Sequence, residues 1–158
     1  MYQRKYQKRG VIMYIAEQLQ TSTVDELTLR SYRPPSRGTY MVISEDSKTI
    51  LIGNIYHSPN SSSENNEYLR RCIDECGRLG YKHVVIMEDF NIDWDTWNGR
   101  SEKDAKFIET IQDNFLYQHV DQPTRYRIGQ NPTLDDLVMS NIEELIQDLT
   151  YLDPLVTR

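Results

Sequence analysis

The chain has 158 residues, of which 38% are hydrophobic and 27% charged, and its formal net charge is −6 at pH 7. The length fits one domain, the composition is globular rather than disordered or collagenous, and no apolar stretch is long enough for a membrane span or resembles a secretory leader. The acidic balance argues against a general nucleic-acid coat protein, because phosphate affinity comes from clustered Lys and Arg, but it leaves room for a nuclease with a local basic rim.

The first part of the chain is rich in strand patterns. Residues 10–16 are apolar on both faces, which predicts a central strand and places the start of the chain inside a sheet. Residues 24–29 predict a second, less regular strand. Residues 40–44 and 49–56 predict a further pair with an acidic turn between them. Together these segments predict an antiparallel meander.

A helix and a buried strand follow the meander. Ser61 with Glu64 resembles a capping box, which predicts a helix over residues 64–79. Gly80 would end this helix. Residues 83–87 are then expected to form a buried strand, so that a helix feeds the sheet.

The second half of the chain predicts one more helix and two more strands. Ser101 with Asp104 would cap the helix. We expect four of its residues to face the core: Ala105, Ile108, Ile111 and Phe115. Residues 134–140 predict a strand, residues 141–145 a helical turn, and residues 149–152 a last short strand.

The two cysteines predict a reduced protein. Cys72 and Cys76 lie one helical turn apart, on the same stripe as Leu69, Ile73 and Leu79. A Cys-x3-Cys pair without a second Cys or His pair is a poor zinc site, and nothing indicates an oxidising compartment. We therefore expect buried, reduced cysteines in an intracellular protein.

An acidic loop at residues 88–95 holds four carboxylates and one amide in eight residues. If the apolar run before it is a strand, alternation puts Asp89 and Asn91 on the same face at its end. A carboxylate and an amide that converge on one point suit a hard cation and a phosphate. Two kinds of metal site are compatible with this loop.

The first is a calcium loop of the EF-hand type, because Asp89, Asn91, Asp93 and Asp95 stand at alternate positions. Trp94 stands where the sharp turn needs glycine, and a strand rather than a helix precedes the loop. Residue 100 is an arginine where the bidentate glutamate belongs. The pattern therefore argues against calcium.

The second is a phosphodiesterase site, which needs a carboxylate to hold a metal or orient water, an amide near the phosphate, and acids from other strands. Asp135 and Asp136 could supply such an acid, since a carboxylate in an apolar strand is costly unless it is paired or functional. Only one of them can face a given side of the sheet, and an edge or loop position for both is an equal alternative.

Tyr56 closes its predicted strand, either as a buried structural tyrosine or as a phenol that hydrogen-bonds a phosphate. The three histidines lie in no nucleophile or ligand pattern: His57, His83 and His119. This favours structural or exposed histidines over catalytic ones.

Four motifs occur in a fixed order along the chain: Tyr-His-Ser-Pro-Asn at 56–60, Glu-Asp-Phe-Asn-Ile at 88–92, Pro-Thr-Arg at 123–125, and residues 133–141. In this order the chain resembles the endonuclease/exonuclease/phosphatase superfamily, specifically the apurinic-like endonuclease domain of non-LTR retrotransposons. Those domains have Tyr-Arg-Pro-Pro-Asn, Gly-Asp-Phe-Asn, Pro-Thr-Arg and Leu-Asp-Leu-Val-Phe-Thr-Asn. The matches span nearly the whole chain.

The resemblance implies an α/β fold, a four-layer sandwich of two mixed sheets packed face to face with helices outside. Residues 1–158 would form a single partial domain that is incomplete at both termini. The resemblance also implies nicking of DNA with Mg²⁺ or Mn²⁺, so DNA is the expected partner, with no membrane and no protein partner indicated. A nuclear location would suit a retroelement product.

The resemblance assigns roles to four residues. Asp89 matches the acid that positions the attacking water and is the nearest candidate for a metal ligand, and Asn91 matches the amide that binds near the scissile phosphate. Tyr56 matches the tyrosine that lines the phosphate site. Asp136 matches the acid that orients the catalytic histidine, because aligning Asp-Leu-Val leaves Asp135 at an apolar, expendable position.

The sequence also departs from the family. The metal-binding Glu and an early Asn would precede residue 10, and the closing Ser-Asp-His would follow Arg158. Glu88 replaces a glycine beside the site, and His57 replaces an arginine that would be available to phosphate. We therefore expect an impaired or inactive endonuclease fragment. The alternative is a non-catalytic retroelement remnant with at most weak metal or DNA binding.

Overall fold

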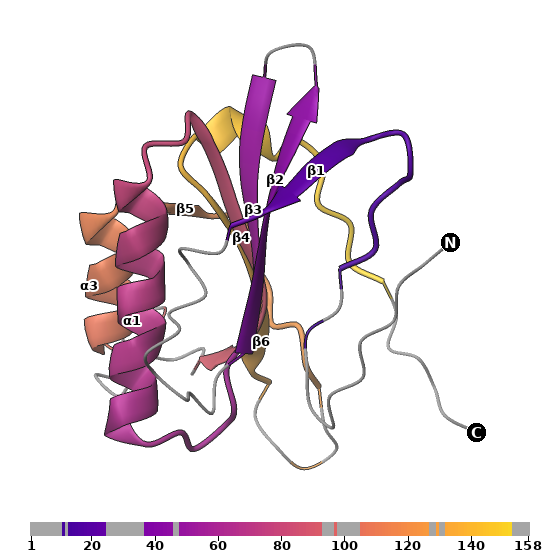
Figure 1. The fold of residues 1–158 in the computed structure, drawn as a ribbon. Helices are drawn as coiled ribbons and strands as arrows, with labels where there is room; N and C mark the ends of the chain where they lie inside the picture. Colours follow the sequence, from indigo (N-terminus) through magenta and orange to yellow (C-terminus); the bar gives the residue numbers. More distant parts are fainter. Residues whose placement is uncertain are drawn as a thin grey trace.

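A computed structural model describes residues 11, 13–24, 37–45, 48–92, 97, 105–126, 129 and 132–152. The strands of these residues form one six-stranded mixed sheet in the order β1-β2-β3-β4-β6-β5. Their bounds are Gln20–Thr23 (β1), Arg37–Glu45 (β2), Lys48–Tyr56 (β3), His83–Ile92 (β4), Tyr117–Gln118 (β5) and Leu134–Ser140 (β6). Helices α1 (Ser63–Arg78) and α3 (Ala105–Asp113) lie side by side on one face of the sheet (Figure 1).

The α/β class is confirmed, but the four-layer sandwich is not, because the described residues form one sheet rather than two. Two segments expected to be strands are irregular. Residues 11 and 13–16 form no strand, and neither do residues 149–152, so both of these predictions were wrong. An apolar run makes a central strand only where neighbouring strands pair with both of its edges; here Tyr14 is 73% exposed.

The predicted antiparallel meander is present in part, as β1, β2 and β3. Strands β2 and β3 match the expected pair, and they stay in register from Arg37↔Tyr56 to Glu45↔Lys48. Strand β1 lies earlier than expected: it ends at Thr23, Val24 is buried just beyond it, and residues 25–29 lie outside the described residues.

Helix α1 connects β3 to β4 as a crossover between parallel strands. Its N-cap is Ser62, whose Oγ accepts a hydrogen bond from the Asn65 backbone N–H at 3.3 Å, and not the expected Ser61. Ser61 is used differently: its hydroxyl donates to the Ser58 carbonyl at 2.6 Å. Gly80 follows the helix with φ 69°, so it ends α1 as predicted.

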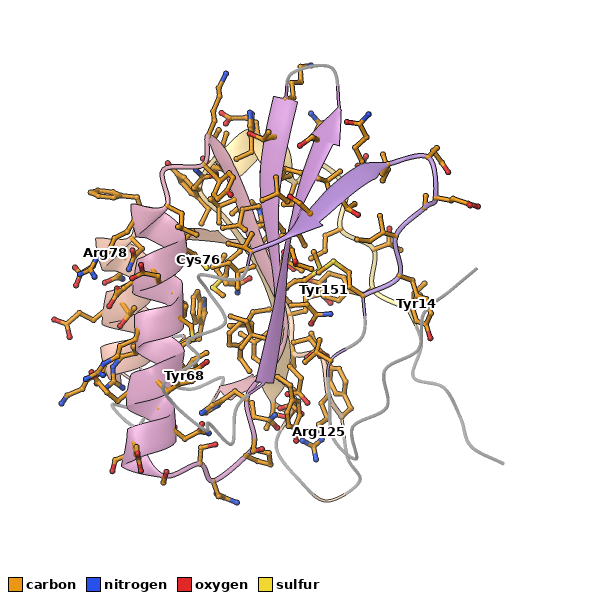
Figure 2. All side chains as sticks on the ribbon, viewed as in Figure 1. Tyr14, Tyr68, Cys76, Arg78, Arg125 and Tyr151 are labelled. Carbon is orange, nitrogen blue, oxygen red and sulfur yellow. The ribbon has the colours of Figure 1, made fainter. Side chains whose placement is uncertain are left out.

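The core lies between the helices and the sheet. Helix α1 contributes the expected stripe, including Leu69, Cys72, Ile73 and Cys76, and both cysteines are buried and form no disulfide. Figure 2 shows Tyr68 and Cys76 on the side of α1 that faces the sheet. Burial raises the pKa of the Cys76 thiol to about 12, which keeps it protonated.

Helix α3 presents a different face from the expected one. Its buried residues are Phe107, Thr110 and Ile111, so only Ile111 of the expected four is fully buried, and Ile108 is partly buried. Ala105 is exposed and Phe115 is 82% exposed, because the helix ends at Asp113 and Phe115 turns outward with φ 53°. Ser101 and Asp104, the expected cap, lie outside the described residues.

Strand β6 and the turn after it follow the prediction. Strand β6 has the expected bounds, and a 3₁₀ turn, η1 (Glu143–Leu145), falls inside the expected helical turn. Strand β5 was missed because two residues carry no periodicity. Among the described residues, no helix is long and apolar enough to cross a membrane.

A contact between α1 and the end of α3 makes a testable packing prediction. A Cβ added at Gly77 would lie 2.5 Å from Asn114 Oδ1, and Asn114 Nδ2 is held by Asp74 Oδ1 at 2.7 Å and by a backbone carbonyl. Alanine favours a helix interior over glycine by about 1 kcal/mol. We expect the clash with Asn114 to outweigh this gain, so that Gly77→Ala lowers the free energy of unfolding by about 1 kcal/mol net.

In an Asn114→Ala background the obstacle is absent, so the same substitution should raise the free energy of unfolding. Urea unfolding of the four proteins in this double-mutant cycle measures the difference. Equal effects of Gly77→Ala in both backgrounds would show that the close approach carries no energy.

Candidate active site

Three of the four expected site residues meet at one end of the sheet. Asp89 on β4 pairs with Asp136 on β6. Strands β3 and β4 are parallel, and the hydrogen bond from the His57 backbone N–H to the Asp89 carbonyl, 2.8 Å, places the end of β3 beside Asp89. Because side chains alternate along each strand, Tyr56, Asp89 and Asp136 share the face that lies opposite to the helices.

Asn91 reaches this group through a break in the strand. The β4–β6 register shifts between Asp89 and Ile92, and Asn91 has φ 49°. A bulge of this kind re-aims a side chain. Asn91 Nδ2 donates to the His57 carbonyl at 2.8 Å and to Asp89 Oδ1. The acid and the amide therefore meet as expected, through a bulge rather than through plain alternation.

Asp89 is the most perturbed carboxylate of the site. Its pKa is raised to about 6, first by burial and then by the negative charges of Asp135 and Asp136. The Asn91 backbone hydrogen bond and the Arg125 guanidinium oppose this rise. A carboxyl group with a pKa near the working pH can both accept a proton and, with a cation nearby, carry a full negative charge.

Asp135, expected to be expendable, has a structural partner. It is 7% exposed, and Arg125 Nη1 donates to its Oδ2 at 2.5 Å. This bond raises the pKa of the Arg125 guanidinium further. A buried carboxylate of this kind is costly to leave unpaired, so Arg125 and Asp135 hold the Pro-Thr-Arg segment against β6.

Thr124 adds a second link between that segment and the site. Its Oγ1 accepts hydrogen bonds from the backbone N–H groups of Asp135 at 3.1 Å and Asp136 at 2.9 Å. Spacing alone did not identify Thr124 or Arg125, although the Pro-Thr-Arg motif was the available signal. The motif therefore fixes the backbone that carries Asp136.

All three histidines of the chain are described, and none hydrogen-bonds to Asp136. His57 is 7% exposed, with Nδ1 3.0 Å from the Phe90 carbonyl and Nε2 2.9 Å from Asn66 Oδ1. His119 Nε2 lies 2.7 Å from Ser140 Oγ, and His83 begins β4 at the end far from Asp89. His57 is thus turned inward, so its side chain is not presented to a phosphate.

The donor set fits a weakly held Mg²⁺. Within the part of the chain that the structure describes, no group of three or more His, Cys, Asp or Glu side chains is placed to hold a metal ion. Mg²⁺, however, usually keeps several waters and binds through one or two carboxylates plus substrate phosphates. Asp89 and Asp136 offer such oxygens, and a cation would offset the repulsion that raises the pKa of Asp89.

A groove of about 640 Å³ opens beside Asp136, lined in part by Thr124, Tyr126, Val138 and residues 149–152. Tyr151 fixes residues 149–152 beside the groove. Its hydroxyl donates to Asp121 Oδ1 at 2.8 Å and accepts from the Asp121 backbone N–H at 2.9 Å. Figure 2 shows Arg125 and Tyr151 on the side of the sheet away from α1.

Comparison with known proteins places this site in context. A family model described as endonuclease-reverse transcriptase matches residues 50–155, which include all four expected site residues. Among solved structures, the chain is similar to the endonuclease domain of TRAS1, a telomere-specific non-LTR retrotransposon, with a TM-score of 0.63 and 18% identity. This match covers 82% of the chain and 59% of the TRAS1 chain, and at this identity it shows the fold.

A second solved structure is an endonuclease/exonuclease/phosphatase family protein from Leptotrichia buccalis, at 18% identity and a TM-score of 0.43. That match covers 68% of this chain and 43% of the other. No curated protein sequence matches the chain.

Proposed function

Because the chain belongs to the endonuclease-reverse transcriptase family, we propose that its site is built for hydrolysis of DNA phosphodiester bonds with Mg²⁺ or Mn²⁺. The observation that supports this most is that four residues lie at one end of the sheet, with the Asn91 amide bonded to the Asp89 carboxylate: Tyr56, Asp89, Asn91 and Asp136. A retroelement endonuclease acts on genomic DNA, so we also propose that the protein works inside the cell, in the nucleus.

Asp89 and Asn91 would act as one unit. Asp89 would orient the attacking water by accepting a hydrogen bond from it through a carboxylate oxygen. Asn91 holds the Asp89 carboxylate through its Nδ2 and would exchange that bond for one to a phosphate oxygen. A divalent cation bound through Asp89 would act as a Lewis acid and neutralise charge on the phosphate.

Tyr56 and Asp136 would flank this unit. The Tyr56 phenol would donate a hydrogen bond to the phosphate from the end of β3. Asp136 would orient a general-base histidine, but none of the three histidines in residues 1–158 contacts it. We therefore propose that this polypeptide alone is an impaired or inactive endonuclease.

The second candidate is a non-catalytic retroelement protein that binds metal or DNA weakly. Two observations on the described residues favour it: no histidine contacts Asp136, and no three potential ligands gather to hold a metal. General-base and metal contributions are each worth about a hundredfold or more in rate, so a site without either would bind without cleaving.

A nicking assay with supercoiled plasmid and Mg²⁺ or Mn²⁺ tests the level of activity. We expect residues 1–158 to nick DNA no faster than the Asp89→Ala variant. Nicking that Asp89→Ala abolishes would contradict the impairment and would establish an active enzyme.

Paramagnetic line broadening by Mn²⁺, with a short DNA duplex present, tests the site itself. Broadening should centre on Asp89 and Asn91 and should disappear in Asp89→Asn. The matched control is Asp113→Asn, which removes an exposed carboxylate at the end of α3 and should leave the broadening unchanged. Broadening centred elsewhere would refute the proposed site.

A further inference from the structure

His57 makes contacts with three consecutive residues at the bulged end of β4. Its backbone N–H donates to the Asp89 carbonyl at 2.8 Å, its ring Nδ1 lies 3.0 Å from the Phe90 carbonyl, and its own carbonyl accepts from Asn91 Nδ2 at 2.8 Å. A carbonyl can only accept, so Nδ1 donates to Phe90. One residue at the end of β3 therefore bonds each member of the Asp-Phe-Asn triplet.

These contacts lie where the regular pairing of β4 with its neighbouring strands ends. The parallel β3–β4 pairing ends at Asn54↔Met87, and the β4–β6 pairing shifts register after Asp89. A bulge leaves backbone groups without ladder partners. The bond between the His57 ring and the Phe90 carbonyl is buried, so this carbonyl would be costly to leave unbonded, and the ring supplies the missing donor.

The ring is itself held from the other side. Nε2 lies 2.9 Å from Asn66 Oδ1, and Asn66 stands in the first turn of α1, with its backbone N–H bonded to the Ser62 carbonyl. At 7% exposed, the imidazole has little freedom to move. Helix α1 is thus connected through Asn66 and His57 to the bulged end of β4, which carries Asp89 and Asn91.

We propose that His57 is a positioning residue that fixes the Asp89–Asn91 pair through the Phe90 carbonyl. The bonds determine where Asn91 Nδ2 points, because the same amide group bridges the His57 carbonyl and Asp89 Oδ1. The effect of His57 on DNA cleavage rests on the proposed function, but the positioning of Asp89 and Asn91 does not. Without the ring, the bulge would relax, and the amide would leave the carboxylate.

Three variants test this. His57→Phe keeps the ring volume but removes both ring hydrogen bonds, whereas His57→Asn keeps a donor near the Nδ1 position. His119→Phe is the matched control, because it removes a histidine bonded to Ser140 Oγ at the other end of β6. Each folded variant is compared by two-dimensional NMR, without metal or DNA.

In His57→Phe we expect the side-chain amide signals of Asn91 to move to the position of solvent-exposed asparagines. The backbone amide of residue 57 should exchange with solvent about tenfold faster, because its bond to Asp89 opens locally. In His57→Asn both readouts should return most of the way to wild type. His119→Phe should leave both unchanged, even if it lowers the melting temperature as much as His57→Phe does.

Unchanged Asn91 signals in His57→Phe would overturn the proposal, and so would equal changes in His119→Phe. If His57→Phe does not fold, His57→Asn decides alone: displaced Asn91 signals despite a retained donor would refute the role of the ring bond. Because these readouts need neither metal nor DNA, loss of the proposed nuclease function would not disturb them.

Discussion

Replacing Phe90 by alanine is expected to lower the free energy of unfolding by about 3–5 kcal/mol. Phe90 is the largest fully buried side chain of the described residues, and its ring lies 5.6 Å from the Phe107 ring at an angle of 45°. Alanine would leave a cavity between β4 and α3 and would remove this aromatic pair. For a domain of ordinary stability this loss is a large part of the total free energy of unfolding.

Urea unfolding followed by circular dichroism measures this loss. Phe90→Leu is the matched control: it keeps most of the buried volume and should cost roughly half as much or less. Because Phe90 stands between Asp89 and Asn91, Phe90→Ala should also disturb the Asn91 side-chain signals, whereas Phe90→Leu should not. A loss below about 1.5 kcal/mol for Phe90→Ala would show that Phe90 does not anchor the bulged end of β4 in the core.

The parts of the fold that the sequence predicts well are those where one pattern has one structural solution. Strand β6 and the β2–β3 pair contain apolar runs, with an acidic turn between β2 and β3, and α1 combines a serine cap, an apolar stripe and Gly80. Residues 13–16 show the opposite case. Their apolar pattern is that of a central strand, but whether they become one depends on strands that must pair with both edges, which is a tertiary condition.

The sequence predicts four residues of the candidate site, but not the contacts that hold them in place. Tyr56, Asp89 and Asn91 stand out because each lies where an apolar strand gives way to polar residues. Asp136 lies inside a strand, and only the family resemblance selects it over Asp135. Their catalytic roles remain a prediction.

The Arg125–Asp135 pair and the His57–Phe90 bond join residues 10 and 33 positions apart, and no local pattern encodes such distances. The prediction of which α3 residues face the core was wrong for a related reason. With few apolar residues in the helix, a shift of one position changes which of them face the core, and tertiary packing decides that.

Asp89→Asn is expected to stabilise the protein at neutral pH and to have little effect in acid. The pKa of Asp89 in the folded protein is about 6, against a usual value of 3.8, so the folded state holds a proton that the unfolded chain releases. The stability this provides is fully present below pH 3.8 and is lost as the pH rises through 6. At neutral pH the charged carboxylate therefore opposes folding, and asparagine removes that cost while its Oδ1 can still accept from Asn91.

Urea midpoints of the wild type and Asp89→Asn, compared from about pH 4 to about pH 8, test this. The variant should gain over the wild type as the pH rises through 6, whereas Asp113→Asn, at an exposed position, should show no such step. Saturating Mg²⁺ should narrow the gap if Asp89 binds the ion, because only the wild type would then gain stability from binding. A variant less stable than the wild type at neutral pH would mean that Asp89 contributes to folding. The raised pKa of Asp89 could then no longer be explained as the unfavourable effect of placing several charges together in a phosphate-binding site.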